Sequence, residues 1–147
     1  MTTRIYDAFH AHANMNLTEV KVYGIDSIPS VTEVVRKMPC VVPLLGDTAG
    51  APGFSIMAVS AGQGDMTLTP AFLLIVQKPE TERPQQIPKA VFAAFEAYFN
   101  AIRADPDLGG KLDQDIVLSP VQFGVFDWAG ASWAGAKITH TWEFLIG

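Results

Sequence analysis

One stretch, residues 87–110, decides the fold class: IPKAVFAAFEAYFNAIRADPDLGG. Its main apolar residues recur at spacings of four, four, three and four, which is the period of an amphipathic helix. They are Ile87, Val91, Phe95, Tyr98 and Ile102. Pro88 suits the first turn of a helix, and the glycine pair at 109–110 suits its C-terminal turn. The stretch therefore predicts a long helix with one buried face.

Shorter elements of both kinds surround this helix. Ser30 and Glu33 match a capping box, which predicts a short helix that ends before Pro39. We also expect a first helix up to about residue 16 and strands over 20–25, 54–61, 66–77, 116–126 and 136–146.

Two prolines limit the predicted strands. Pro43 restricts residues 40–45 to an edge or a loop, and Pro70 indicates an edge position or a bulge in the hairpin over 54–77. The order helix, strand, helix, hairpin, helix, hairpin predicts a single α+β domain over residues 1–147. We expect a mainly antiparallel sheet with its helices on one side.

Composition excludes several classes of protein. Charged residues make up 17% of the 147, below the roughly 25% of an ordinary soluble domain. The net charge of −5 argues against nucleic-acid binding, and no apolar run approaches the ~20 residues of a membrane span. The N-terminus has no secretory signal pattern, and the single cysteine, Cys40, cannot form an internal disulfide, so we expect synthesis in the cytoplasm. The low charge predicts an apolar surface that meets another protein.

The histidines and the cysteine do not form a catalytic motif. His10 and His12 point apart on a helix, and His140 lies on the apolar face of the last predicted strand. A hydrogen-bonded core or interface histidine is the favoured interpretation of His140. Cys40 has no neighbouring histidine or cation, which indicates an unreactive thiol.

The acidic cluster after the long helix partly matches a calcium loop. Asp105, Asp107 and Gly110 fit positions one, three and six, but Gly109 and Ile116 stand where ligands are needed. We therefore expect a capped helix end. The glycine-rich segments lack the phosphate-loop spacing. Together these patterns predict no catalytic residue, no cofactor and no metal, and thus a protein that is not an enzyme.

The candidate interface residues lie in segments that read as loops. Residues 128–136, WAGASWAGA, place Trp128 and Trp133 among small residues, and tryptophan is enriched at interface hot spots. The alternative, that both rings pack onto the domain's own core, stays equally open. The other candidates are the loop glycines Gly50, Gly53, Gly62 and Gly64.

The segment 90–110 resembles a pattern of tailed-phage minor tail proteins, in which an amphipathic helix ends in Ala-Asp-Pro-x-Leu-Gly-Gly and a strand pair follows. Ile28-Pro29 and residues 38–43, MPCVVP, also resemble the region before that family's central hairpin. The family is that of tail-terminator, or tail-completion, proteins.

This resemblance implies a structural role in a phage or prophage virion. Such a protein has an α+β fold, assembles as a ring, usually a hexamer, on the tail tube, and forms the head–tail joining surface. Its partners would be its own copies, the tail tube protein and a head–neck connector protein, with no membrane and no specific nucleic-acid binding. It would be made in the host cytoplasm and reside in the virion tail. The alternatives are another virion neck or tube protein, or a small-molecule-binding or enzymatic α+β domain.

Overall fold

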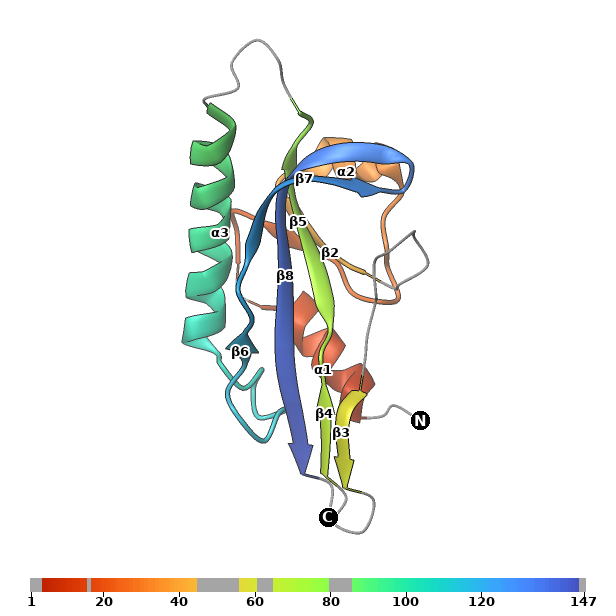
Figure 1. The fold of residues 1–147 in the computed structure, drawn as a ribbon, viewed down its shortest axis with the longest axis vertical. Helices are drawn as coiled ribbons and strands as arrows, with labels where there is room; N and C mark the ends of the chain where they lie inside the picture. The colour runs from red at the N-terminus through yellow and green to blue at the C-terminus, as the bar shows by residue number, and fades with distance from the viewer. Residues whose placement is uncertain (1–3, 16, 45–55, 61–64, 80–85, 146–147) are drawn as a thin grey trace.

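The computed structural model describes residues 4–15, 17–44, 56–60, 65–79 and 86–145 (Figure 1). Its helices are α1 (Arg4–Ala13), α2 (Val31–Lys37) and α3 (Gln86–Ala104). Its strands are β1 (Lys21–Val22), β2 (Cys40–Pro43), β3 (Ile56–Ser60), β4 (Asp65–Leu68), β5 (Ala71–Gln77), β6 (Val117–Leu118), β7 (Gln122–Trp128) and β8 (Ala131–Leu145).

The strands form one sheet around β8, the long strand in the middle of Figure 1. The order of the strands is β1-β2-β5-β8-β4-β3. β6 and β7 lie outside this order and pair with the edge of β8 that faces away from β5. β1 and β2 are parallel, and the other pairs of described strands are antiparallel. The predicted α+β class with a mainly antiparallel sheet is confirmed.

Helices cover both faces of the sheet, so the prediction of helices on one side is wrong. Phe9 of α1 and Tyr98 of α3 pack in one core layer with Phe72 of β5. Val34 of α2 packs in a second layer with Leu73, the next residue of β5. The signal was present in the sequence, because residues 71–76 form a continuous apolar run, which is typical of a strand buried on both faces.

Prolines interrupt two of the predicted strands. Residues 66–77 form β4 and β5, which are separated at Pro70 and both pair with β8. Pro70 is buried in the sheet, and its carbonyl oxygen accepts a hydrogen bond of 2.9 Å from the His140 N–H. Residues 116–126 are likewise divided into β6 and β7 around Pro120. Proline lacks the N–H that a continuous ladder requires, so each predicted strand breaks at its proline. β5 stays inside the sheet, between β2 and β8, whereas β6 and β7 pair with β8 alone among the described strands.

The remaining differences concern the ends of elements. Residues 40–43 form the strand β2, which lies between β1 and β5 at Cys40 and Val41, so this part is not an edge or a loop. Pro43, its last residue, pairs with β5 alone among the described strands. β1 covers only part of the predicted strand over 20–25. The expected cap of α2 is present, since Ser30 Oγ accepts a hydrogen bond of 3.3 Å from the Glu33 N–H.

The segment after α3 is a capped turn, as predicted. Leu108, Gly109 and Gly110 have φ values of 53°, 67° and 83°. The carboxylate of Asp105 accepts a hydrogen bond of 2.8 Å from the Gly109 N–H, and that of Asp107 accepts one of 3.2 Å from the Gly110 N–H. Leu108 is fully buried, so the turn fastens the end of α3 to the core.

Candidate interaction surface

Four large apolar side chains of α3 and β7 are exposed on one part of the molecule. They are Phe92 (49% exposed), Phe99 (39%), Phe123 (44%) and Val125 (59%), and we call them the α3–β7 patch. Phe92 and the partly buried Phe95 both meet the Phe123 ring edge-to-face, with centroid distances of 5.0 and 5.5 Å. These contacts hold β7 against α3.

A shallow groove of about 240 Å³ lies beside the patch. It is lined by Ile87, Pro88, Val91 and Phe92 of α3 and by residues 123–125 of β7. None of these side chains is charged. An exposed aromatic cluster beside an uncharged groove is typical of a surface that binds another protein.

Backbone groups add to this surface. Among the described strands β7 pairs with β8 alone, so its other edge presents unpaired N–H and C=O groups to solvent. The structure thus places an open strand edge next to exposed apolar side chains, an arrangement that suits the addition of a further strand.

Comparison with known proteins does not assign this surface to a family. No protein-family model matches the chain, and no curated protein sequence is similar to it. The helices of the described segments include none that is long and apolar enough to cross a membrane.

The predicted interface tryptophans are core residues. Trp133 is fully buried and Trp128 is 9% exposed, and both pack with Val34 and Leu73 in the second core layer. Trp133 Nε1 donates a hydrogen bond of 3.1 Å to the Trp128 carbonyl oxygen. The prediction of a loop over 128–136 is therefore wrong, and of the two readings of these rings the structure has packing onto the chain's own core.

The hairpin turn explains why the loop prediction failed. β7 and β8 are joined by Ala129 and Gly130 alone, with φ values of 52° and 80°. Two consecutive residues with positive φ make a type I′ turn, so β7 and β8 stay paired right up to the turn. The other candidates, Gly50, Gly53, Gly62 and Gly64, lie outside the described residues.

Sequence reasoning did not identify the α3–β7 patch, because nothing in the local pattern of any one member separates it from a core residue. Phe92 and Phe99 widen the apolar stripe of α3 beyond what the sheet covers, and their separation of seven residues places them on one side of the helix. Phe123 and Val125 alternate in the predicted strand like core residues. The excess width of the stripe was the available signal.

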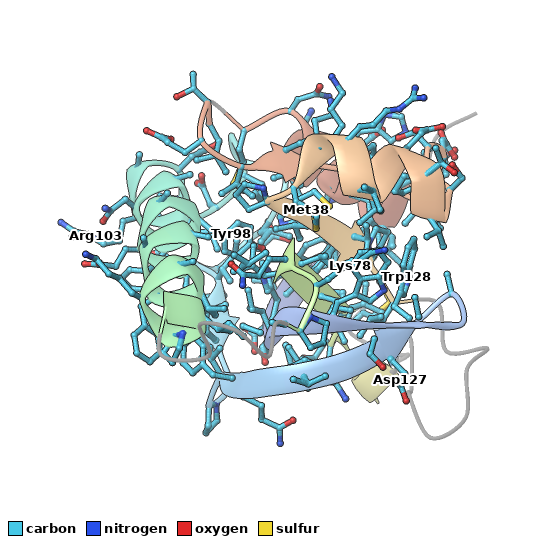
Figure 2. The ribbon with its side chains drawn as sticks, turned by 90° about the horizontal axis from the view of Figure 1, so that it is seen from above. Met38, Lys78, Tyr98, Arg103, Asp127 and Trp128 are labelled. Carbon is cyan, nitrogen blue, oxygen red and sulfur yellow. The ribbon has the colours of Figure 1, made fainter. Side chains whose placement is uncertain are left out.

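A buried polar network joins α1, α3 and β8. The Tyr98 hydroxyl lies 2.6 Å from His12 Nε2 and 2.8 Å from His140 Nε2. Trp142 Nε1 donates a hydrogen bond of 3.0 Å to His140 Nδ1. In Figure 2 the labelled Tyr98 lies between α3 and the sheet, whereas Arg103 points outward. His140 is thus a hydrogen-bonded core histidine, one of the two alternatives favoured from the sequence.

The Trp142 N–H fixes the direction of every hydrogen bond in this network. Because His140 Nδ1 accepts it, the proton of neutral His140 is on Nε2 and is donated to the Tyr98 oxygen. Tyr98 then donates its own proton to His12 Nε2, which places the remaining proton of His12 on Nδ1. That nitrogen is buried and has no hydrogen-bond partner among the described residues.

Burial controls the protonation of these groups. Desolvation lowers the pKa of His12 to about 3 and the pKa of His140 well below its usual value, to which the nearby His12 adds. Desolvation also raises the pKa of Tyr98 well above 10. Since His12 and His140 are 1% and 0% exposed, the network is closed to solvent and joins elements of the core.

The other candidate groups tie surface segments together. Asp26 accepts a hydrogen bond from the Tyr6 hydroxyl and lies 3.1 Å from His10 Nε2.

Among the described residues, no three His, Cys, Asp or Glu side chains are grouped so that they could hold a metal ion. Burial raises the pKa of the Cys40 thiol to about 12, which keeps it protonated and unreactive at neutral pH.

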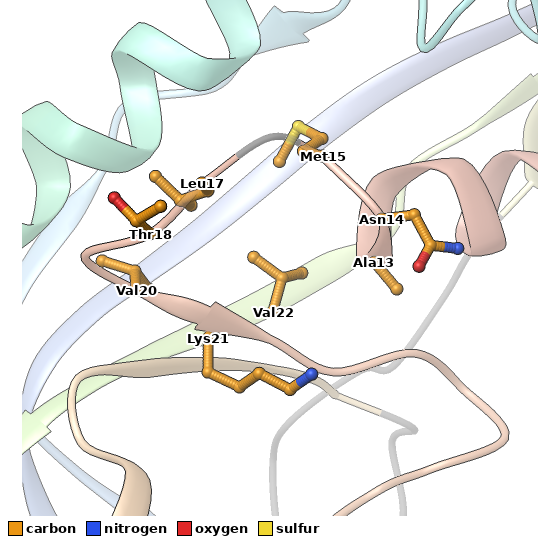
Figure 3. A pocket seen from close by; sticks show the side chains of 8 residues that line it. All are labelled: Ala13, Asn14, Met15, Leu17, Thr18, Val20, Lys21 and Val22. Carbon is orange, nitrogen blue, oxygen red and sulfur yellow. The ribbon is translucent and has the colours of Figure 1, made fainter.

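A second hollow, of about 300 Å³, lies between the end of α1 and β1 (Figure 3). Lys21 is the charged residue among the described side chains that line it. Its ammonium group lies 5.6 Å from the centre of the Tyr23 ring. The hollow therefore combines fewer features of a protein-binding surface than the α3–β7 patch. We take the α3–β7 patch as the candidate functional site.

Proposed function

We propose that this chain is a structural subunit of a phage or prophage tail, which caps the tail tube as a ring and forms the head–tail joining surface. The observation that carries the proposal is the exposed, uncharged α3–β7 patch. Two of its four residues, Phe92 and Phe99, lie in the 90–110 segment that resembles tail-terminator proteins. A patch of this kind suits contact between subunits.

The geometry of the 90–110 segment supports a rigid assembly surface. Leu108 anchors the end of α3 in the core, while Asp105 and Asp107 close the turn. The helix consequently presents Phe92 and Phe99 from a fixed backbone. Preorganised side chains lose less conformational entropy when a partner binds.

A ring also requires a second, different surface on each subunit. Ile28 (37% exposed) and Val35 (42% exposed) lie in and before α2, which covers the other face of the sheet. These two separate apolar regions suit head-to-tail contacts between copies. The net charge of −5 suits a lumen through which DNA passes without being held, because carboxylates repel phosphates.

The partners in this proposal are further copies of the chain, the tail tube protein and the connector protein. A position as another neck or tube protein would use the same surfaces. A small-molecule-binding or enzymatic role has less support, because the described histidine–tyrosine network is sealed from solvent.

Tail tubes grown in vitro test this proposal. The tail tube protein from the same genome is polymerised with increasing amounts of the chain, and tube lengths are measured by electron microscopy. We expect shorter tubes with a ring at one end, and a loss of this effect in Phe92→Asp. The control is Val117→Asp, which changes an exposed residue outside the patch. Tubes of unchanged length at saturating wild-type protein would contradict the proposal.

A further inference from the structure

The register of the β7–β8 hairpin determines which backbone groups of β7 are open. Trp128 and Ala131 flank a two-residue turn, so they form a hydrogen-bonded pair, and such pairs alternate along the ladder. Residues 122, 124 and 126 therefore direct their N–H and C=O groups to β8. The corresponding groups of Phe123, Val125 and Asp127 point away from β8.

This edge lacks the features by which proteins usually protect an exposed strand. Its pairing with β8 is continuous from Gln122 to Trp128, without the register shift seen between β5 and β8. Residues 122–126 contain no charged residue and no proline. An open, regular and uncharged edge strand is a template for another strand.

We infer that the open edge of β7 pairs with β7 of a second copy of this chain, antiparallel and around a two-fold axis at Gly124. This pairing places Phe123 of each copy opposite Val125 of the other, and each such pair exchanges hydrogen bonds in both directions. Aromatic and β-branched side chains form favourable cross-strand pairs. The edge is thus complementary to itself, which is the requirement for a two-fold contact.

The charges select this register over its neighbour. An axis at Val125 would place Phe123 opposite Asp127 of the second copy and bury a carboxylate beside an aromatic ring. With the axis at Gly124, Asp127 faces Val121, outside the paired core of the strand. Gly124 faces its own counterpart in a pair that is not hydrogen-bonded, and a side chain added there meets nothing within 4 Å in the single chain.

The same pairing covers the apolar groove. Phe123 and Val125 lie on the α3 side of the sheet, because Phe123 packs against Phe92 and Phe95. The two-fold axis therefore brings both copies of α3 onto one face of a continuous sheet, with their exposed phenylalanines directed toward the junction. The dimer is independent of the tail proposal, and a ring that used the same patch would form only after the dimer separates.

Two matched valines test the surface. Val125 (59% exposed) and Val117 (62% exposed) both lie in strands that pair with β8, but only Val125 belongs to the patch. Light scattering should give wild-type chain a mass of twice 15.9 kDa at high concentration. Val125→Lys should raise the dimer dissociation constant by at least about 30-fold, whereas Val117→Lys should change it less than about threefold. A monomeric wild type, or equal effects of both variants, would overturn the inference.

A cysteine at the axis tests the register. In the proposed pairing the Cα atoms of residue 124 in the two copies lie about 4.5 Å apart, within the range that a disulfide spans. Gly124→Cys should give a disulfide-linked dimer on mild oxidation, and Val117→Cys should not. Cys40 is fully buried and does not compete. A dimeric Gly124→Cys variant that fails to cross-link would show that another surface or register is used.

These measurements use the isolated chain in solution, so their outcome is distinct from that of the tail-tube experiment. Circular dichroism confirms that each variant is folded before its mass is interpreted. An association that weakens as salt is added would contradict an apolar contact between two chains of charge −5, since salt screens their repulsion.

Discussion

The hydroxyl of Tyr98 on α3 lies 2.6 Å from Nε2 of His12 on α1, so a buried hydrogen bond joins the two helices that cover one face of the sheet. The same hydroxyl accepts the proton of His140 on β8. One oxygen atom therefore links three elements that are distant in the sequence.

Tyr98→Phe should destabilise the chain by about 3 kcal/mol, because it leaves ring nitrogens of two buried histidines unpaired. Urea unfolding followed by tryptophan fluorescence gives the free energy. Tyr6→Phe is the control, since it removes a tyrosine hydroxyl from a hydrogen bond on the surface and should cost less than about 1 kcal/mol. Similar losses in both variants would mean that the network contributes little.

Acid should destabilise the chain from about pH 6.5 downward. Above this pH His12 and His140 are neutral in the folded and unfolded states, so these two residues add no pH dependence. Below it the unfolded state binds protons that the folded state excludes, because burial lowers the pKa of His12 and of His140.

Unfolding in urea at pH 7.5 and at pH 5 should therefore show a loss of about 2–4 kcal/mol at the lower pH. Asp113, whose pKa is lowered mainly by the Leu145 N–H, contributes only below about pH 4 and does not affect this window. His12→Gln should reduce the slope by about half. A stability that stays constant down to pH 5 would contradict buried, neutral histidines.

Gly135→Ala should destabilise the chain by more than about 3 kcal/mol, since its Cβ would lie 1.8 Å from the Leu74 carbonyl oxygen. Its cross-strand partner, Gly124, provides the matched control. A Cβ at Gly124 meets nothing within 4 Å, so Gly124→Ala should change the stability by less than about 1 kcal/mol. Thermal melts of both variants compare the two sites directly.

Trp133→Ala should cost about 3–5 kcal/mol of stability, because the ring is fully buried. Phe92→Ala should cost less than about 1.5 kcal/mol, because its side chain is 49% exposed, yet it should weaken self-association. The two effects are separated by measuring chemical denaturation and mass in solution for each variant. A Trp133→Ala chain that keeps its melting temperature would contradict the core position.

The sequence was sufficient for α3 and its capped turn, because both depend on local spacing and on nearby glycines. It also indicated that His140 lies on a buried face, from the alternation along β8. The hairpin over Trp128 and Trp133 was missed, since small residues look like a loop when their partner strand is unknown. Gly135 is small because β5 approaches it closely, which only the folded sheet reveals.

The α3–β7 patch depends on tertiary packing in the same way. Phe92 and Phe95 are equally apolar, and the register between α3 and the sheet decides which of them is exposed. Local periodicity identifies the apolar stripe of a helix, but it does not show how much of that stripe the sheet buries.

The central position of β8 affects how the chain folds during its synthesis. β4 and β5 are complete at Gln77, but their common partner begins at Ala131, so the ribosome adds more than 50 residues before the sheet can close. At roughly 5–20 residues per second the apolar run of β5 waits for several seconds beside an emerging chain. Translation speed and chaperones that bind exposed strands should therefore affect the yield of soluble protein.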